Sequence, residues 1–335
     1  MGVKSKENLS EYEAKYRELR PGYEKLAEEI QFAIEKKLKA KDIKVAAVTY
    51  RAKVVEKFLE KIERKFYDNP LKEVTDLAGV RVVCLYESDL PKVKEIVRTE
   101  FKVNEEIDKR EDLGTDKMGY QGKHFVVELG KGYSGARYNE LQGLKCEIQV
   151  RTVLQDAWAI ISHHLVYKNE DSVPEKFRRD LNNVAAMLEV AQMVFDNVRK
   201  KRDHYRDELK QKRKLKDSSA FLSQPVNYDT LEAYTKWKFP NLQISKQWHE
   251  RMVADLNVTK YHSLQDIDDI VEAAAPAVEA YRQQRQDMFK AGTAFLTKSL
   301  GFVDKEFRVR HPFAEATLVA FEEFKDLVGA KPTKK

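Results

Sequence analysis

The chain has 335 residues, of which 42% are hydrophobic and 35% are charged, and its formal net charge is +6. This length is enough for roughly two domains, and the apolar content excludes wholesale disorder. No apolar run approaches the ~20 residues of a membrane-spanning helix, and the N-terminal residues lack the apolar stretch of a signal peptide, so we expect a cytoplasmic protein. Two cysteines, Cys84 and Cys146, are too few for a disulfide framework or a zinc site, and we interpret both as buried structural residues.

Two helices are predicted before the first strand. Residues 7–40 carry apolar side chains at spacings of three or four, with an interruption expected at Pro21-Gly22. Residues 51–67 place apolar side chains on one side and basic side chains on the other. We expect residues 1–45 to be an N-terminal helical segment and residues 46–216 to be the main domain, closed by helices of its own.

Within the main domain the periodicity changes to that of a sheet. Residues 78–86 are rich in β-branched residues and predict a buried strand, and residues 124–129 and 144–150 predict two more. Residues 90–101 predict a helix between the first two strands. Strands separated by helices are typical of a mixed α/β (α+β) core, which we expect to be confined to about residues 74–151.

Beyond this core the sequence is helical. The helical period resumes at residue 152 and continues almost to residue 216. Ser218-Ser219 and Gln224-Pro225 then indicate a boundary near residues 217–225. Residues 217–335 predict a mainly helical C-terminal module, to which the sequence assigns no role.

Two features of the C-terminal module indicate how it packs. Trp237, Phe239 and Trp248 are expected to form a small core. The helix through Ile267 and Val278 has an apolar face that can pack on the main domain or on a second subunit. A homo-oligomer is therefore one expectation for this chain.

A strongly basic segment lies just before the module. Residues 200–216 hold nine basic and three acidic residues. Their net charge of +6 equals the formal net charge of the whole chain. Such a segment can bind a polyanion such as tRNA or another RNA. It can equally be a solvated helix face held by ion pairs, among them Asp203–Arg206 and Glu208–Lys212. The sequence leaves both interpretations open.

A second basic cluster follows Arg51. Lys53, Lys57, Lys61 and Arg64 recur at spacings of four and three, which predicts one stripe along a helix. Like charges stacked in this way repel each other, and a polyanionic ligand would relieve the repulsion. An ordinary basic helix face is the alternative.

A third group of candidate site residues lies in or next to the predicted strands. Asp76 precedes the first buried strand, where an acidic side chain can ligate Mg²⁺ or serve in a turn. Arg81 lies inside an apolar run and therefore needs a partner or an exposed edge. In the stretch Gly119–His124, two glycines allow close backbone approach and Tyr120 offers a flat face for a base, although a simple turn would contain the same residues.

The last predicted strand carries a fourth polar cluster. Alternation along the strand places Glu147, Gln149 and Arg151 on one face, with the apolar side chains packed behind. An acidic side chain in this position can bind a metal or take a proton from a hydroxyl group.

In their order and spacing, these residues resemble the RelA/SpoT synthetase family. The matching motifs are Asp76-Leu-Ala-Gly-Val-Arg81, Gly119–His124, Glu147-Ile-Gln-Val-Arg-Thr152 and Gln155-Asp-Ala-Trp-Ala159 with His163. The resemblance implies a nucleotidyltransferase-like mixed β-sheet flanked by helices. It also implies Mg²⁺-dependent transfer of pyrophosphate from ATP to the 3′-hydroxyl of GDP or GTP, which makes the stringent-response alarmones ppGpp and pppGpp.

The resemblance also implies roles for individual residues. Asp76 and Glu147 would be the catalytic residues and metal ligands, and Glu147 would also activate the attacking hydroxyl. The implied ATP-binding residues are Arg51, Lys53, Lys61, Arg64 and Arg81. The implied residues for the acceptor nucleotide are Lys117, Tyr120, His124, Gln149 and Asp156.

Some of these roles are specific to one part of a nucleotide. Arg51 and Arg81 are the implied pair around adenine, and Tyr120 is the implied stacking partner of guanine. His124 would contact a phosphate of the acceptor. A carboxylate at Asp156 can accept hydrogen bonds from guanine N1–H and its exocyclic amine, a donor pair that adenine lacks.

Two departures from the family pattern bear on function. Many members have Arg-Ser after the Gly-Tyr pair where this chain has Gln121-Gly122, which affects one phosphate contact. No histidine is followed by aspartate, so the adjacent His-Asp pair of the family's hydrolase is missing, and we expect a synthetase-only, small-type member. Two alternatives stay open: a toxin-type relative that pyrophosphorylates the 3′ end of tRNA, and a catalytically silent nucleotide or RNA sensor.

Overall fold

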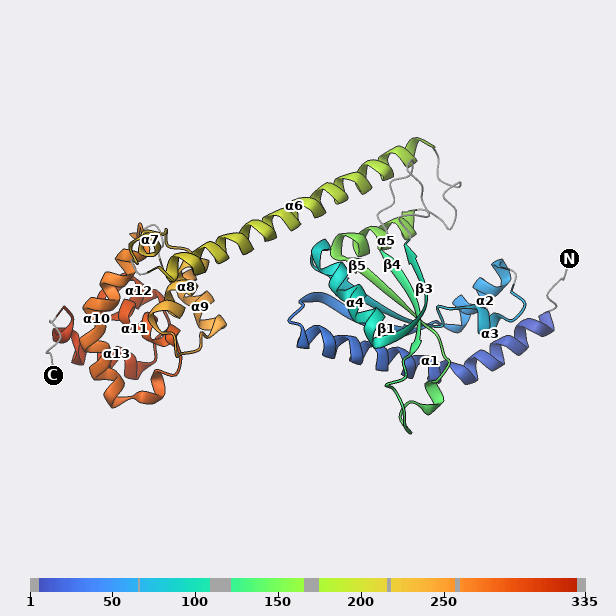
Figure 1. Cartoon of the computed structure of the whole chain (residues 1–335), viewed down its shortest axis with the longest axis horizontal. Coiled ribbons are helices and arrows are strands. Elements are labelled where there is room, and N and C mark those ends of the chain that lie inside the picture. The colour runs from blue at the N-terminus through green and yellow to red at the C-terminus, as the bar shows by residue number, and fades with distance from the viewer. Residues whose placement is uncertain are drawn as a thin grey trace. The chain divides into compact units, whose positions relative to one another are not determined.

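The computed structural model describes residues 6–65, 67–108, 122–165, 175–215, 218–256 and 260–329. The chain divides into two compact units, Met1–Arg199 and Lys200–Lys335. Figure 1 shows the whole chain. The division falls inside helix α6 (Glu175–Arg213), whereas the sequence places a boundary near residues 217–225. The extent of the main domain, residues 46–216, stays a prediction. Among the described residues there is no helix that is both long and apolar enough to cross a membrane.

A five-stranded mixed sheet forms the centre of the first unit, which confirms the expected mixed α/β fold. The strands lie in the order β1-β2-β5-β4-β3. β2 and β5 are parallel, and the other neighbours are antiparallel. The strands are β1 Val45–Ala52, β2 Ala78–Cys84, β3 Phe101–Asp108, β4 Lys123–Leu129 and β5 Cys146–Thr152.

The two edge strands, β1 and β3, depart from the sequence prediction. The expectation that the sheet is confined to residues 74–151 is wrong, because β1 lies before that range. Edge strands bury less of their surface than central strands and lack a continuous apolar run; in β1 only Ala52 is buried. The helix expected from residue 51 begins later, as α2 (Val55–Arg64).

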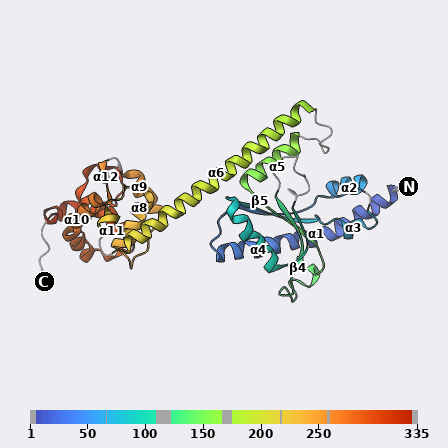
Figure 2. The same ribbon diagram turned by 45° about the horizontal axis from the view of Figure 1, so that its top comes forward.

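Helices cover both faces of the sheet. α1 (Lys6–Ala40) and α4 (Leu90–Glu100) lie together on one face, and α5 (Val153–Leu165) lies on the other, as Figures 1 and 2 both show. The short helix α3 (Pro70–Glu73) and two 3₁₀ turns, Glu87–Asp89 and Asn139–Leu141, complete the elements described before α6.

Helix α1 runs without a break through Pro21-Gly22, so the expected interruption is wrong. A proline inside a helix costs about 3 kcal/mol, because it removes a hydrogen bond and crowds the preceding turn. α1 offsets this cost by burying Leu26, Ile30 and Ile34 completely against the sheet. Each such side chain contributes about 1.5–3 kcal/mol on burial.

Tyr16 joins α1 to the connection between β1 and α2. Its ring is fully buried and lies 4.5 Å from the ring of Phe58, measured between centroids. Its hydroxyl donates to the backbone oxygen of Lys53 at 2.6 Å. Burial raises the pKa of Tyr16 to about 12, so the phenol keeps its proton and remains a donor at neutral pH. This contact fixes the backbone from which the Lys53 side chain projects.

The described part of the second unit is helical, as expected for the C-terminal module. Its helices after α6 are α7 Ser219–Leu222, α8 Tyr228–Lys238, α9 Lys246–Asp255, α10 Leu264–Gln284, α11 Gly292–Val303, α12 Lys305–Arg310 and α13 Glu315–Glu323. Two 3₁₀ turns, Gln286–Met288 and Lys325–Leu327, follow α10 and α13. α10 and α11 pack against each other at the centre.

Two expectations for this module need correction. The apolar face of α10 is buried inside the module, where Ile267 and Val278 are at most 5% exposed, so it is not available to a second subunit. Trp237 and Phe239 pack against the module's core, but Trp248 is 47% exposed. The three aromatic residues therefore do not form one cluster.

The basic segment at the end of α6 is partly neutralised inside the second unit. Arg206 contacts Asp229 at 2.6 Å, and Glu208 contacts His204 at 3.1 Å, which replaces the expected Asp203–Arg206 and Glu208–Lys212 pairs. Arg202 also contacts Asp229, and Lys210 contacts Asp207. Within the described residues, the basic side chains of this segment that have no ion pair are Lys200, Lys201, Lys212, Arg213 and Lys214.

We predict that Tyr16→Phe lowers the free energy of unfolding of the first unit by about 1–3 kcal/mol, because it leaves the buried carbonyl of Lys53 without its donor. Tyr12→Phe is the matched control: Tyr12 lies on the same helix, and its hydroxyl makes no hydrogen bond to a described residue. Urea denaturation followed by circular dichroism measures both variants. Equal stability of the two would contradict the proposed contribution of this hydrogen bond.

Candidate active site

The candidate site lies on the face of the sheet opposite α1 and α4. Val80 of β2 and Ile148 of β5 belong to the core beneath those helices, so the residues that alternate with them face the other way. The strand register places Arg81 beside Gln149 of β5, and Gln149 beside His124 of β4. Three adjacent strands therefore deliver polar side chains to one surface, as the alternation in the sequence predicts for β5.

Glu147 is the centre of a hydrogen-bond chain across these strands. Its Oε1 lies 3.0 Å from His124 Nδ1, and its Oε2 accepts from Gln149 Nε2 at 2.7 Å. On the far side of the imidazole, Nε2 lies 3.2 Å from the guanidinium of Arg151. Because a guanidinium can only donate, Nε2 is the acceptor and Nδ1 carries the proton that is donated to Glu147.

These contacts keep Glu147 ionised. Burial opposes ionisation of this carboxyl group, but the hydrogen bonds from His124 and Gln149 and the positive charge of Lys61 outweigh burial. Together they lower the pKa of Glu147 to about 2. Glu147 is therefore a carboxylate at neutral pH.

Asp76 lies between two lysines. Its carboxylate oxygens are 2.7 Å from Lys53 Nζ and 2.8 Å from Lys61 Nζ. Burial again opposes ionisation, but the hydrogen bonds from both lysines hold the pKa of Asp76 below its usual range. The predicted helical stripe is wrong, because Lys53 precedes α2 and Lys57 pairs with Glu60 instead. Two members of the basic cluster converge on one carboxylate.

The two carboxylates lie near the same end of the parallel strands β2 and β5, where both strands begin. Gly79 pairs with Glu147, and Asp76 precedes Gly79 by three residues. Lys61 connects the two groups, because it contacts Asp76 directly and its charge acts on Glu147. Among the described residues, no cluster of three or more His, Cys, Asp or Glu side chains could hold a metal alone. Two carboxylates completed by substrate phosphate oxygens are, however, a donor set that suits Mg²⁺.

Arg81 has the partner that its place in an apolar strand requires. Its Nη1 lies 3.1 Å from Oδ1 of Asp156, in the first turn of α5, and Arg151 lies 3.7 Å from the same oxygen. Arg81 Nε, Arg151 Nε and Asp156 Oδ1 are nevertheless buried without a well-formed hydrogen bond, and they are three of the four such side-chain atoms in the described residues. Because native structures leave few buried polar groups unsatisfied, these atoms indicate a place for a polar ligand.

The two remaining residues predicted for ATP lie at the margin of the site. Arg51 of β1 pairs with Gly79, and its Cγ is 3.7 Å from where a Cβ on residue 79 would be. Arg51 lies on the same face as Arg81, which is two positions along the neighbouring strand. Arg64 is exposed at the end of α2 and has no ion pair with a described residue.

Some expectations lie outside what the structure describes, and some residues of the site were missed. Lys117 and Tyr120 fall in residues 109–121, outside the described ranges, so their roles stay predictions. The sequence gives no role to Arg151, although its side chain links His124 to Asp156. Alternation along the strand placed Arg151 on the polar face with Gln149, but no local signal indicated these two contacts, because they come from β4 and α5.

Gly122 packs directly against β5. A Cβ on residue 122 would lie 2.3 Å from Arg151 Cγ and 2.6 Å from the carbonyl oxygen of Val150. A serine at this position, which is frequent in the family pattern, would therefore require the loop or Arg151 to move. The departure at residue 122 is thus coupled to the placement of Arg151.

We predict that Gly122→Ala lowers the free energy of unfolding by about 1–3 kcal/mol, because the added methyl group overlaps a backbone oxygen and forces the chain to shift. Gly132→Ala is the control, since nothing lies within 4 Å of a Cβ at that position. Thermal unfolding by calorimetry compares the two. A Gly122→Ala protein as stable as Gly132→Ala would show that this packing is not tight.

Comparisons with known proteins show what this part of the chain is similar to. Residues 50–172 match the family described as the region found in RelA / SpoT proteins. The GTP pyrophosphokinase YjbM of Bacillus subtilis is 35% identical over 145 residues, which are 41% of this chain and 64% of that protein. The GTP pyrophosphokinase YwaC of the same bacterium is 30% identical over 141 residues, which are 40% of this chain and 64% of that protein. A crystal structure of small alarmone synthetase 1 from Bacillus subtilis is 26% identical, covers 57% of this chain and 98% of its own, and has a TM-score of 0.48.

The extent of these matches defines what they cover. This chain spans just under two thirds of the length of YjbM and of YwaC. The family match, residues 50–172, contains both carboxylates, Asp76 and Glu147, and ends before the helical second unit. Residues 50–172 of the chain are therefore similar to the region found in RelA / SpoT proteins.

Proposed function

We propose that the chain is a pyrophosphokinase that transfers pyrophosphate from ATP to the 3′-hydroxyl of GDP or GTP, giving ppGpp or pppGpp. The observation that carries the proposal is the pair of ionised carboxylates, Asp76 and Glu147, at one strand edge and linked by Lys61. Two polyanionic nucleotides repel each other, and a cradle of lysines and arginines offsets that repulsion. The names of YjbM and YwaC, both GTP pyrophosphokinases, support the same reaction.

On the donor side, Lys53 and Lys61 hold the phosphates of ATP. Both ammonium groups contact Asp76. A triphosphate carries more negative charge than one carboxylate, so the lysines can turn to the phosphates and release the oxygens of Asp76. Arg51 and Arg81 lie on neighbouring strands and face the same side, which suits stacking of adenine between two guanidinium groups.

Asp76 and Glu147 would hold Mg²⁺ together with phosphate oxygens of ATP. The low pKa of both groups supports this assignment, because neither has to lose a proton before binding a cation at neutral pH. When bound, the metal stabilises the negative charge that develops on the transferred group.

On the acceptor side, Glu147 accepts the proton of the 3′-hydroxyl. The 3′-oxygen forms a bond to the β-phosphorus of ATP while the bond from that phosphorus to the α,β-bridging oxygen breaks, and AMP leaves. With a pKa of about 2, Glu147 is a weak base as long as His124 donates to it. The reaction therefore includes a shift of His124 from Glu147 to a phosphate of the acceptor, which frees Oε1 and raises its basicity.

Asp156 reads the acceptor base in this proposal. Its Oδ1 is buried without a well-formed hydrogen bond, and a carboxylate can accept from both N1–H and the exocyclic amine of guanine. Arg81, which the proposal assigns to ATP, lies 3.1 Å from the same oxygen. A change at Asp156 would therefore also affect a residue of the ATP site. Gln149 lies beside the ribose, while Tyr120 and Lys117 supply the stacking face and a phosphate contact.

A direct test follows the label from ATP. The purified chain is incubated with ATP labelled in its terminal phosphates, with and without Mg²⁺, together with GDP, GTP or tRNA. We expect label on GDP or GTP, and only when the divalent cation is present. Label on tRNA alone would overturn the proposed acceptor, and no transfer to any acceptor would overturn the reaction.

One observation favours tRNA as the alternative acceptor. Five basic side chains of residues 200–214 have no ion pair among the described residues, and such a surface can bind a nucleic-acid backbone. A tRNA-modifying enzyme would lose its activity steeply as the salt concentration rises, and would lose it again when Lys210, Lys212, Arg213 and Lys214 are neutralised. Transfer to free GDP should be nearly unchanged by that neutralisation.

We predict that Glu147→Gln reduces the rate of transfer by about 10²–10⁴-fold, because it removes both a metal ligand and the proton acceptor while it keeps the size of the side chain. Single-turnover transfer measures the rate, and calorimetry shows whether the nucleotides still bind. The matched control is Glu105→Gln, an exposed strand residue on β3. Retention of more than about a tenth of the wild-type rate would rule out this role for Glu147.

We predict that Asp156→Ala weakens binding of GDP and GTP about tenfold or more, while ATP binding changes less. A hydrogen bond to a charged group contributes about 1.5–3 kcal/mol, which sets the size of the effect. Calorimetry measures the affinity for each nucleotide. The control is Asp68→Ala, because Asp68 is exposed. An equal loss of ATP affinity would mean that Asp156 acts by holding Arg81 rather than by reading guanine.

A further inference from the structure

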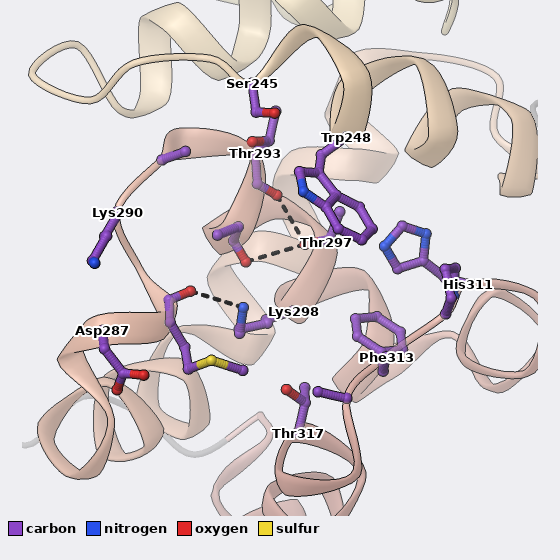
Figure 3. Close-up of a pocket in the computed structure, with 15 residues that line it drawn as sticks. Ser245, Trp248, Asp287, Lys290, Thr293, Thr297, Lys298, His311, Phe313 and Thr317 are labelled. Atoms are coloured by element: carbon purple, nitrogen blue, oxygen red, sulfur yellow. Dashed lines mark hydrogen bonds between the residues drawn. The ribbon is translucent and has the colours of Figure 1, made fainter.

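The second unit contains a cavity that the proposed transfer reaction does not use. Its volume is about 380 Å³, within the range of small-molecule sites. It is lined by the start of α9, the segment that leads into α11, the first half of α11, and the residues that join α12 to α13. Figure 3 shows these side chains around the cavity.

Lys298 places a buried positive charge beside this cavity. The residue is 7% exposed, and its Nζ donates to the backbone oxygen of Met288 at 3.0 Å and lies 4.7 Å from the ring centroid of Phe289. An ammonium group has three donors, and the Met288 oxygen is the one acceptor that it finds among the described residues. Figure 3 shows this bond at the side of the cavity.

No carboxylate of the described residues forms an ion pair with Lys298. Asp287 also lines the cavity, but it is exposed and forms an ion pair with Arg285 at 3.0 Å. Burial lowers the pKa of Lys298 to about 8 although the charge of Asp287 acts in the opposite direction, and the side chain stays largely protonated at neutral pH. A buried charge without a direct ion pair destabilises a protein, so an anion in contact with the ammonium group is the partner that this position lacks.

The start of α11 adds to the positive potential. α11 is twelve residues long, and its N-cap residue, Ala291, has no side chain that could accept from the first backbone N–H groups. Thr293 and Ala294 of this first turn line the cavity. The positive end of the helix dipole therefore acts on the same space as Lys298, and the exposed Lys290 adds a second cation at the rim.

Aromatic side chains form another part of the wall. Trp248 is 47% exposed, and its ring centroid lies 5.9 Å from that of the buried His311, whose Nδ1 contacts Asp255 at 2.8 Å. Phe313 is half-buried beside them. In the view of Figure 3, Trp248, His311 and Phe313 lie across the cavity from Lys298. A large, accessible indole that lines a concave site is suited to contact with a planar apolar group.

We infer that this cavity binds a small aromatic anion, with its carboxylate or phosphate group at Lys298 and the start of α11 and its ring against Trp248 and Phe313. The inference does not depend on the transfer reaction, because it uses residues of the second unit alone.

Calorimetric titration of the full chain tests this site with three probes of similar size: benzoate, phenyl phosphate and the neutral benzyl alcohol. We expect at least one anion to bind with a dissociation constant of about 1 mM or tighter, and benzyl alcohol to bind at least about tenfold more weakly. The stronger of the two anions identifies the carboxylate or the phosphate as the preferred group.

Two variants locate the binding. Lys298→Met should weaken the anion about tenfold or more and should raise the melting temperature of the second unit, because it removes the uncompensated charge. Lys305→Met, an exposed lysine at the start of α12, should change neither. Ala294→Leu should fill the cavity and abolish binding of all three probes while Lys298 remains in place.

Three results would overturn the inference. The first is equal binding of benzyl alcohol and the anions, which would mean that charge is not recognised. The second is anion binding that both Lys298→Met and Ala294→Leu leave unchanged, which would place it elsewhere on the chain. The third is no binding of either anion up to about 10 mM.

Discussion

Two carboxylates that are buried beside the strands of one sheet must be neutralised by their neighbours, and this requirement organises the candidate active site. Lys53 and Lys61 keep Asp76 ionised, and His124 and Gln149 do the same for Glu147. Each of these neighbours is also a group that the proposed function assigns to a nucleotide. Binding of substrates would therefore exchange the partners of charges that already exist, which is the electrostatic preorganisation that phosphoryl transfer needs.

The sheet topology brings the two carboxylates together. β2 and β5 are parallel, so the loop before β2 and the start of β5 meet at one edge, although Asp76 and Glu147 are far apart in the sequence. The helix on the opposite face contributes indirectly, because Tyr16 of α1 holds the backbone at Lys53. Stability of the fold and geometry of the site are therefore linked through a single buried hydroxyl.

The carboxylates of the candidate active site and Lys298 of the second unit differ in how their buried charge is compensated. In the first unit, the carboxylates lie in networks where lysine, histidine and glutamine side chains contact them on every oxygen. In the second unit, Lys298 is buried, contacts a backbone oxygen and an aromatic ring among the described residues, and lines a cavity. A buried charge without a direct ion pair lowers stability. That difference is the reason for assigning a ligand to the cavity rather than a structural role to the lysine.

The sequence by itself determined the central strands, the helical character of the C-terminal module and the shared face of Glu147, Gln149 and Arg151, because alternation with a period of two is a local property. It missed the edge strands β1 and β3, in which most of the described residues are at least partly exposed. Only the tertiary structure decided that Lys53 and Lys61 meet at Asp76, that Arg81 meets Asp156, and that Lys298 borders a cavity. Each of these contacts joins separate elements of the fold, and the distance between side chains on different elements depends on how those elements pack, which no local pattern specifies.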